Sequence, residues 1–260
     1  MSSSAIKPPL RTEIRSNVLV VTIDREEAGN SMSLDTATAM RGALREASVR
    51  DDLRGIVITG AGDRFFCSGG DLKAYSAIAT REELASVFGA VRDLLDDIER
   101  HALPVVAAIN GYALGGGAEL ALACDLRFSV AGAKIGFPQS RLGLIPGWNG
   151  TERLVRTVGR SRAIRLLLTA ERLTAAEAAT AGLTDGTSDG DVVAHAVAFL
   201  ANLPAAPLAL AAVKRAVRAS PDADAAFVNA AIFEDLWFTD DHREAEKAFA
   251  EKRQPVFRGR

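Results

Sequence analysis

Three short runs of β-branched and small apolar residues constrain the fold of this chain most. They read VLVVTI at residues 18–23, GIVIT at 55–59 and VVAAI at 105–109. Runs of this length without polar alternation are typical of strands that are covered on both faces. A segment with helical periodicity follows each run. This order of strands and helices predicts an α/β fold with a mixed or parallel sheet.

Helical periodicity separates the three runs and dominates the second half of the chain. Residues 33–48 start behind a capping serine, Ser33, and residues 81–100 carry an apolar stripe. An opening hairpin is predicted around a turn at Ser16 and Asn17. Further helices are predicted at residues 118–124, 151–158, 160–170, 175–181, 192–202, 207–219 and 223–252.

The chain is predicted to have two parts. The first is an α/β core over residues 1–200, which carries the functional site. The second is a helical C-terminal region over residues 201–260. The polar stretch TDGTSDG at 184–190 is predicted to be a surface loop rather than a linker between domains.

Composition and charge exclude several classes of function. The 260 residues carry a formal net charge of −2 and are 48% hydrophobic, so a soluble globular protein without a nucleic-acid partner is expected. No apolar run reaches the ~18 residues of a membrane span, so no membrane association is expected. Cys67 and Cys124 lack partners at metal-ligand spacing and the 3 histidines are scattered, so no metal site is expected. Two cysteines without a disulfide framework fit a reduced, cytoplasmic compartment.

Two glycine-rich segments lie between the predicted strands and the helices that follow them. They read FFCSGGDL at residues 65–72 and GYALGGGAEL at 111–120. Backbone N–H groups at such junctions lack intrahelical partners and favour negative charge, and glycine allows a ligand atom to approach closely. Two such groups directed at one oxygen would form an oxyanion hole. Without a phosphate-loop signature, the residues leave two readings open: an anion or oxyanion site, or glycines that only permit tight turns.

These two segments resemble the two signature loops of the crotonase superfamily, also called enoyl-CoA hydratase/isomerase. The resemblance continues, in family order, through residues 24–32, 135–147 and 248–257, so it covers nearly the whole chain. It implies a crotonase-like (ββα spiral-type) α/β core with a helical C-terminal region. It also implies an acyl-CoA substrate, no cofactor other than the CoA of that substrate, and a homotrimer or dimer of trimers.

The resemblance assigns roles by position. Gly70 and Gly116 are expected to donate their N–H groups to the thioester oxygen, and Glu119 is expected to act as acid or base or to orient water. Without the resemblance, Glu119 could equally be an acid that is stabilised by a helix N-terminus. Contacts with the CoA ester are expected from Ser68, Gly69, Asp71 and Leu72.

Gln139 stands where hydratases of the family carry a second glutamate. A carboxyl group can transfer a proton, whereas an amide cannot titrate. The resemblance implies an enoyl-CoA hydratase-like lyase that acts through an enolate. Because of Gln139, two alternatives stay open: another crotonase reaction (decarboxylation, isomerisation or thioester hydrolysis), or acyl-CoA binding without catalysis. Trp148 either lines the acyl pocket or packs in the core.

Overall fold

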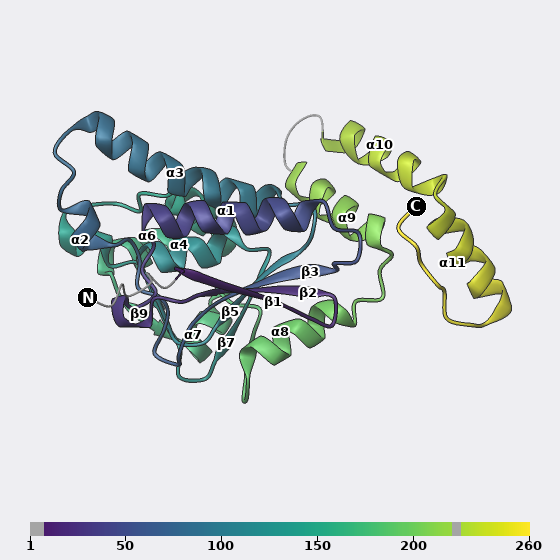
Figure 1. Cartoon of the computed structure of the whole chain (residues 1–260), viewed down its shortest axis with the longest axis horizontal. Coiled ribbons are helices and arrows are strands. Elements are labelled where there is room, and N and C mark those ends of the chain that lie inside the picture. Colours follow the sequence, from purple (N-terminus) through teal and green to yellow (C-terminus); the bar gives the residue numbers. More distant parts are fainter. Residues whose placement is uncertain (1–7, 220–224) are drawn as a thin grey trace, which may run out of the picture.

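A six-stranded sheet forms the centre of the computed structural model, which describes residues 8–219 and 225–260 (Figure 1). Its strand order is β1-β2-β3-β5-β7-β10. The first two strands form the predicted hairpin, with Ser16 and Asn17 at φ values of 49° and 62°, and the other neighbours pair in parallel. The strands are β1 (Leu10–Arg15), β2 (Val18–Ile23), β3 (Gly55–Gly60), β5 (Val105–Ile109), β7 (Leu126–Val130) and β10 (Gly186–Ser188).

Helices cover both faces of this sheet, which explains why its central strands lack polar alternation. Helix α8 (Val192–Ala201) packs on one face, against Val18, Val20 and other side chains of alternate register. On the opposite face, residues such as Leu19 and Val21 pack under the other helical layer. That layer is formed by α1 (Leu34–Ser48), α3 (Arg81–Arg100) and α4 (Gly116–Ala123) (Figure 1).

A second, four-stranded sheet was not predicted from the sequence. Its order is β4-β6-β8-β9. Because each strand has only three residues, none carries a recognisable period of two. Two of them lie inside the glycine-rich segments, just before their glycines, where no strand was predicted. The strands are β4 (Phe65–Cys67), β6 (Tyr112–Leu114), β8 (Lys134–Gly136) and β9 (Arg172–Thr174).

The second half of the chain is helical, as predicted. Its last predicted segment, 223–252, is two helices, and positions 223 and 224 lie outside the described residues. In Figure 1 these two helices extend to one side of the main body. In addition to α8, the helices of this half are α5 (Gly150–Val158), α6 (Arg160–Thr169), α7 (Ala175–Thr180), α9 (Pro207–Ala219), α10 (Ala225–Trp237) and α11 (Asp240–Glu251). The division at residue 200 stays a prediction.

The prediction that residues 184–190 form only a surface loop is wrong. Residues 186–188 form β10, which pairs in parallel with β7 at the edge of the main sheet. Glycine, threonine and serine give this strand no apolar signal, and its pairing partner is distant in sequence. Among the described helices, none combines the length and the apolar character required to cross a membrane.

Gly42 offers a test of the helical layer. It lies in the middle of α1, and a Cβ at this position would have no neighbour within 4 Å. Glycine in a helix interior costs about 0.5–1 kcal/mol relative to alanine. We therefore expect Gly42→Ala to raise the free energy of unfolding by about that amount, measured by denaturant titration. A decrease would contradict the packing described for α1.

Candidate active site

The second sheet brings the two glycine-rich segments into contact. Strands β4 and β6 pair in parallel, with Phe65 opposite Tyr112. Just beyond the strands, a Cβ on Gly69 would lie 3.2 Å from the amide nitrogen of Gly116. Gly69 also has a φ of 116°, a value that side chains rarely allow. The backbones of the two turns therefore approach each other at a point that requires glycine.

The N–H groups of Gly70 and Gly116 have no acceptor among the described residues. The carbonyl of Gly69 accepts a hydrogen bond from the Met32 N–H at 2.8 Å. Because a carbonyl and the following N–H point in opposite directions across a trans peptide, the Gly70 N–H is directed away from Met32. Gly116 is the first residue of α4, so its N–H lacks an intrahelical acceptor. Neither of the two donors predicted for an oxyanion hole is therefore used within the described part of the chain.

Aromatic rings lie against both glycines. A Cβ on Gly70 would overlap the ring of Tyr75, and a Cβ on Gly116 would overlap the ring of Trp148. The Tyr75 ring is 5.1 Å from that of Phe88, between centroids. These rings leave room only for glycine and form an apolar wall beside the two N–H groups. Sequence reasoning missed Tyr75 and Phe88, because nothing in their local pattern indicates which loop they contact.

Trp148 packs in the core, which is one of the two readings that the sequence left open. It is only 2% exposed and belongs to the main apolar core. Its ring also lies directly over Gly116, the first residue of α4. The side chain is therefore part of the core and lies against a residue of the candidate site, and its role in lining the acyl pocket stays a prediction.

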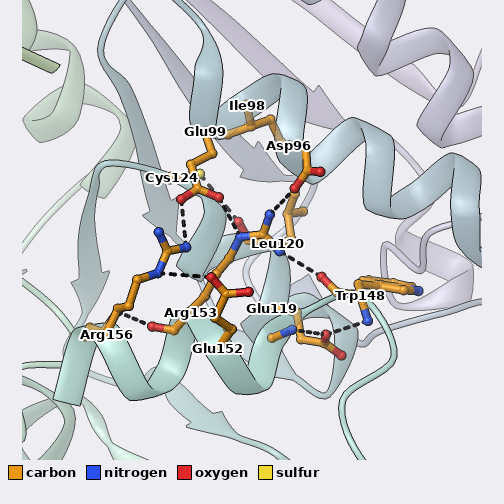
Figure 2. Close-up of polar contacts among 12 residues, drawn as sticks. Asp96, Ile98, Glu99, Glu119, Leu120, Cys124, Trp148, Glu152, Arg153 and Arg156 are labelled. Carbon is orange, nitrogen blue, oxygen red and sulfur yellow. Dashed lines mark hydrogen bonds and ion pairs between the residues drawn. The ribbon is translucent and has the colours of Figure 1, made fainter. Parts of the chain in front are cut away.

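Glu119 is buried in the first turn of α4, at 2% exposure. Its Oε2 accepts hydrogen bonds from the N–H groups of Trp148 and Gly150, at 2.8 and 2.9 Å (Figure 2). Gly150 begins α5, so the carboxylate lies at the N-terminus of a second helix, where negative charge is favoured. Burial raises the pKa of Glu119 above its ordinary value, and these hydrogen bonds oppose that shift. The result is a carboxyl group that protonates more readily than an exposed one.

Gln139 lies beside Glu119, on the 3-10 helix η2 (Pro138–Leu142). Its Nε2 donates to Oε1 of Glu119 at 3.0 Å. Its own Oε1 is buried and has no partner within the described chain. The group beside Glu119 is therefore an amide, which cannot titrate, and it presents one hydrogen-bond acceptor that the described chain does not use.

The first loop is held by an ion pair that sequence reasoning missed. Arg25 contacts Oδ2 of Asp71 at 2.7 Å and the carbonyl of Ser31 at 2.6 Å. The hydrogen bond and charge of Arg25 lower the pKa of Asp71. The other carboxylate oxygen accepts from the N–H of Ala74. Asp71 is therefore engaged within its own loop, and a contact between Asp71 and substrate stays a prediction.

The other residues predicted to contact the CoA ester share this loop. The Ser68 N–H donates to the Gly29 carbonyl at 3.0 Å. Leu72 is the first residue of α2 (Leu72–Tyr75), and its side chain is not among those that the structure describes. Cys67 is buried and unpaired. Among the described residues, no group of three or more His, Cys, Asp or Glu side chains could hold a metal, and the prediction of no cofactor stays a prediction.

Known proteins resemble the chain over almost its full length. A family model described as enoyl-CoA hydratase/isomerase matches residues 13–260. The 2,3-dehydroadipyl-CoA hydratase of Escherichia coli is 36% identical over 94% of this chain and 96% of its own length. The short-chain-enoyl-CoA hydratase of Clostridium acetobutylicum is 34% identical over 93% and 94%. The structure of an enoyl-CoA hydratase from Bacillus anthracis superposes with a TM-score of 0.92 at 31% identity, over 97% of this chain and 100% of that one.

Proposed function

The chain belongs to the enoyl-CoA hydratase/isomerase family of enzymes, and on that premise we propose that it hydrates an enoyl-CoA thioester with a single catalytic carboxyl group, Glu119. The observation that carries this proposal is the buried carboxylate of Glu119, which lies beside an amide instead of a second acid. CoA enters as part of the substrate, and no separate cofactor is required.

The thioester carbonyl is held by the N–H groups of Gly70 and Gly116. Both are free of acceptors among the described residues and lie on turns that touch. Addition at the β-carbon moves the electrons of the C=C bond toward the thioester oxygen, which becomes an enolate oxygen. One preorganised donor to such an oxygen contributes roughly 3–4 kcal/mol of transition-state stabilisation.

One carboxyl group can serve both proton transfers of the hydration. Ionised Glu119 removes a proton from water as the hydroxyl group adds to the β-carbon. The same group, now protonated, gives its proton to the α-carbon of the enolate, and the carboxylate is regenerated. The raised pKa of Glu119 favours this exchange, because it makes the carboxylate a stronger base toward water and brings its pKa nearer the working pH, where one group can act in both protonation states.

The acyl group is proposed to be apolar near the thioester. Tyr75, Phe88 and Trp148 form the wall beside the two N–H groups. Two relatives that are described as hydratases of enoyl-CoA esters support an unsaturated acyl group. A homotrimer or dimer of trimers is part of the proposal, in which exposed aromatic side chains of the C-terminal helices would be covered. These include Phe227, Phe233 and Trp237 of α10, Phe249 of α11, and Phe238 between the two helices.

A second candidate is another reaction of the family, such as decarboxylation, isomerisation or thioester hydrolysis. Gln139 favours it, because such a reaction needs the enolate-stabilising N–H groups but not two carboxyl groups. Turnover on a panel of enoyl-, hydroxyacyl-, malonyl-type and aromatic CoA esters distinguishes the candidates. Acyl-CoA binding without turnover on any of these esters would contradict both.

Gln139→Glu tests the role of the amide. A carboxyl group at this position would lie within hydrogen-bond distance of Glu119 and could share its proton transfers. General acid–base catalysis by a positioned group accelerates a reaction roughly 10²-fold or more. A carboxyl group introduced at position 139 is not optimally placed, so it should provide only part of this acceleration. We expect kcat for crotonyl-CoA hydration to rise by about tenfold, with Gln139→Met, which cannot transfer a proton, as the control. Unchanged or lower activity in Gln139→Glu would favour the second candidate.

A further inference from the structure

Arg153 is a buried arginine whose three guanidinium nitrogens all have partners. It lies on α5 and is 3% exposed. Nε contacts Glu99 at 3.0 Å and Nη2 contacts Asp96 at 2.6 Å, both on α3. Nη1 donates to the carbonyl of Trp148 at 2.8 Å (Figure 2). The guanidinium thus joins α3 to the residue that precedes the N-cap of α5.

Trp148 connects Arg153 to Glu119. Its carbonyl accepts from Arg153, while its N–H donates to Oε2 of Glu119. Asn149 has a left-handed φ of 63°, which lets the N–H groups on either side of it, those of Trp148 and Gly150, converge on one oxygen. Successive N–H groups in such a turn form a concave anion site. The position of this turn determines how well it holds the carboxylate.

We propose that Arg153 is the positioning residue for Glu119: it fixes the Trp148 carbonyl, and thereby holds the two N–H groups of residues 148 and 150 against the catalytic carboxylate. The inference rests on the proposed function of Glu119 and extends it to a residue that touches neither substrate nor the carboxylate itself. It also assigns Arg153 a second effect, because the same carbonyl belongs to the residue whose ring lies over Gly116.

Arginine suits this task for a geometric reason. Three separate acceptors lie around one plane, and only a guanidinium presents donors to all of them at once. Arg156, one turn later on α5, provides the natural comparison. It also contacts Glu99, at 2.7 Å, but its side chain is 52% exposed, and among the described residues it forms no hydrogen bond with Trp148. A substitution at Arg156 therefore disturbs the same acidic partner without reaching the turn.

Charged and titratable side chains face α4 and this turn from several elements. From α3 come Arg92, which donates to the Gly147 carbonyl, and Asp96 and Glu99, which contact Arg153. Arg156 of α5 shares Glu99 with Arg153, and Cys67 of β4 lies against Gly117 of α4. Among the described residues, none of them forms an ion pair with Glu119. Arg92 and Arg153 hold carbonyls of the turn, those of Gly147 and Trp148, and the Arg153 contact is the shorter. Arg153 therefore acts on Glu119 through the turn and not through direct charge.

Loss of the Arg153 contact has a defined signature. A loosened turn presents its N–H groups less well to the carboxylate, so the ionised form of Glu119 loses stabilisation and the pKa of Glu119 rises further. A catalytic base with a higher pKa is protonated over a wider range of acidic pH. The acidic limb of the kcat/KM profile therefore moves to higher pH, whereas the plateau above it changes little.

Arg153→Lys tests this in the full-length enzyme with crotonyl-CoA. Lysine keeps the charge but cannot reach three acceptors. We expect the acidic limb to move up by about one pH unit, so that kcat/KM below the limb falls by about tenfold. Arg156→Lys should leave the limb in place. An equal loss at every pH, an unmoved limb, or an equal shift in both variants would overturn the inference.

Asp96→Asn carries the test if Arg153→Lys does not fold. This substitution removes the charge from the partner of Nη2 and leaves Arg153 in place. The Asp96 side chain is partly exposed. We expect a smaller shift in the same direction, with kcat/KM below the limb lowered by about threefold. An unmoved limb in folded Asp96→Asn protein would overturn the role of this network.

Tryptophan fluorescence gives a measurement that needs no turnover. Trp148 and Trp237 are the 2 tryptophans of the chain, so Trp148 is the sole emitter in a Trp237→Phe background. Its emission should titrate with Glu119, lose that titration in Glu119→Gln, and titrate at higher pH in Arg153→Lys. A titration that is absent from the parent or unmoved in Arg153→Lys overturns the inference. Retained turnover in Glu119→Gln overturns the proposed function instead, so the two failures are distinguishable.

Discussion

Glu119→Gln is expected to lower kcat for enoyl-CoA hydration by about 10³-fold while the affinity for the CoA ester changes little. Two of the carboxylate's hydrogen bonds come from backbone N–H groups, which an amide oxygen can still accept. The amide cannot take a proton from water or return one to the α-carbon. Steady-state kinetics with crotonyl-CoA would measure the loss, and calorimetric titration with the 3-hydroxyacyl-CoA product would measure binding.

The neighbouring amide determines how cleanly this variant can be interpreted. In the native protein, Nε2 of Gln139 donates to Oε1 of Glu119. In Glu119→Gln, the new amide nitrogen would face that donor unless the Gln139 amide turns over. After that turn, Oε1 of Gln139, which has no partner in the native protein, would accept a hydrogen bond from the new amide nitrogen at position 119. The fold therefore tolerates the change. Wild-type turnover in the variant would mean that Glu119 is not the group that moves the proton.

The main sheet and its helices were predictable because their patterns are local. Residues 18–23, 55–59 and 105–109 are short apolar runs, and Ser33 caps α1, because its side chain accepts from the Thr36 N–H. Periodicity and capping are read from neighbouring positions, so no knowledge of tertiary contacts is needed. Fold class and the order of the longer strands and helices followed from these patterns.

The second sheet was not predictable in this way. Strands β4, β6, β8 and β9 have three residues each, and so does β10 of the main sheet, which contains only Gly, Thr and Ser. Such segments become strands because distant partners pair with them, not because of their own sequence. Their pairing matters for function, since the contact between β4 and β6 is what brings the two glycine-rich turns together.

In the candidate site, too, the residues could be predicted from local motifs, whereas their contacts could not. Gly70, Gly116 and Glu119 were named from two local motifs, and Gln139 from a third. Their contacts come from pairings that no local pattern contains: Glu119 reaches Gln139 across 20 positions, and Arg25 reaches Asp71 across 46. The Arg153 network was missed for the same reason, because an arginine on an amphipathic helix is usually exposed.

Helix α4 shows how these contacts converge. Its first residue, Gly116, supplies one of the two predicted donors, and its fourth, Glu119, supplies the carboxyl group, so one helical turn fixes their separation. The Trp148 turn packs on both: its ring covers Gly116 and its N–H contacts Glu119. A change in the contact between Trp148 and Gly116 should therefore alter the contact between Trp148 and Glu119, and the reverse.

Gly116→Ala is the sharpest test of that coupling. The position has no left-handed φ, so alanine is compatible with the backbone and the N–H donor is retained. The new methyl group would, however, overlap the Trp148 ring. We expect the ring and the turn to shift, kcat/KM for crotonyl-CoA hydration to fall by about 10²–10³-fold, and the free energy of unfolding to fall by about 1–3 kcal/mol. Gly42→Ala, where a methyl group meets nothing, should leave kcat/KM unchanged.

A compensating substitution separates the steric cause from a general loss of structure. Phenylalanine at position 148 lacks part of the indole ring that the methyl group would strike and keeps the backbone N–H that contacts Glu119. Gly116→Ala with Trp148→Phe should therefore recover roughly tenfold in kcat/KM relative to Gly116→Ala alone, a coupling of about 1.4 kcal/mol between two touching residues. If the double variant is no better than the product of the single effects, the ring does not transmit the change, and the donor at Gly116 and the carboxylate of Glu119 act independently.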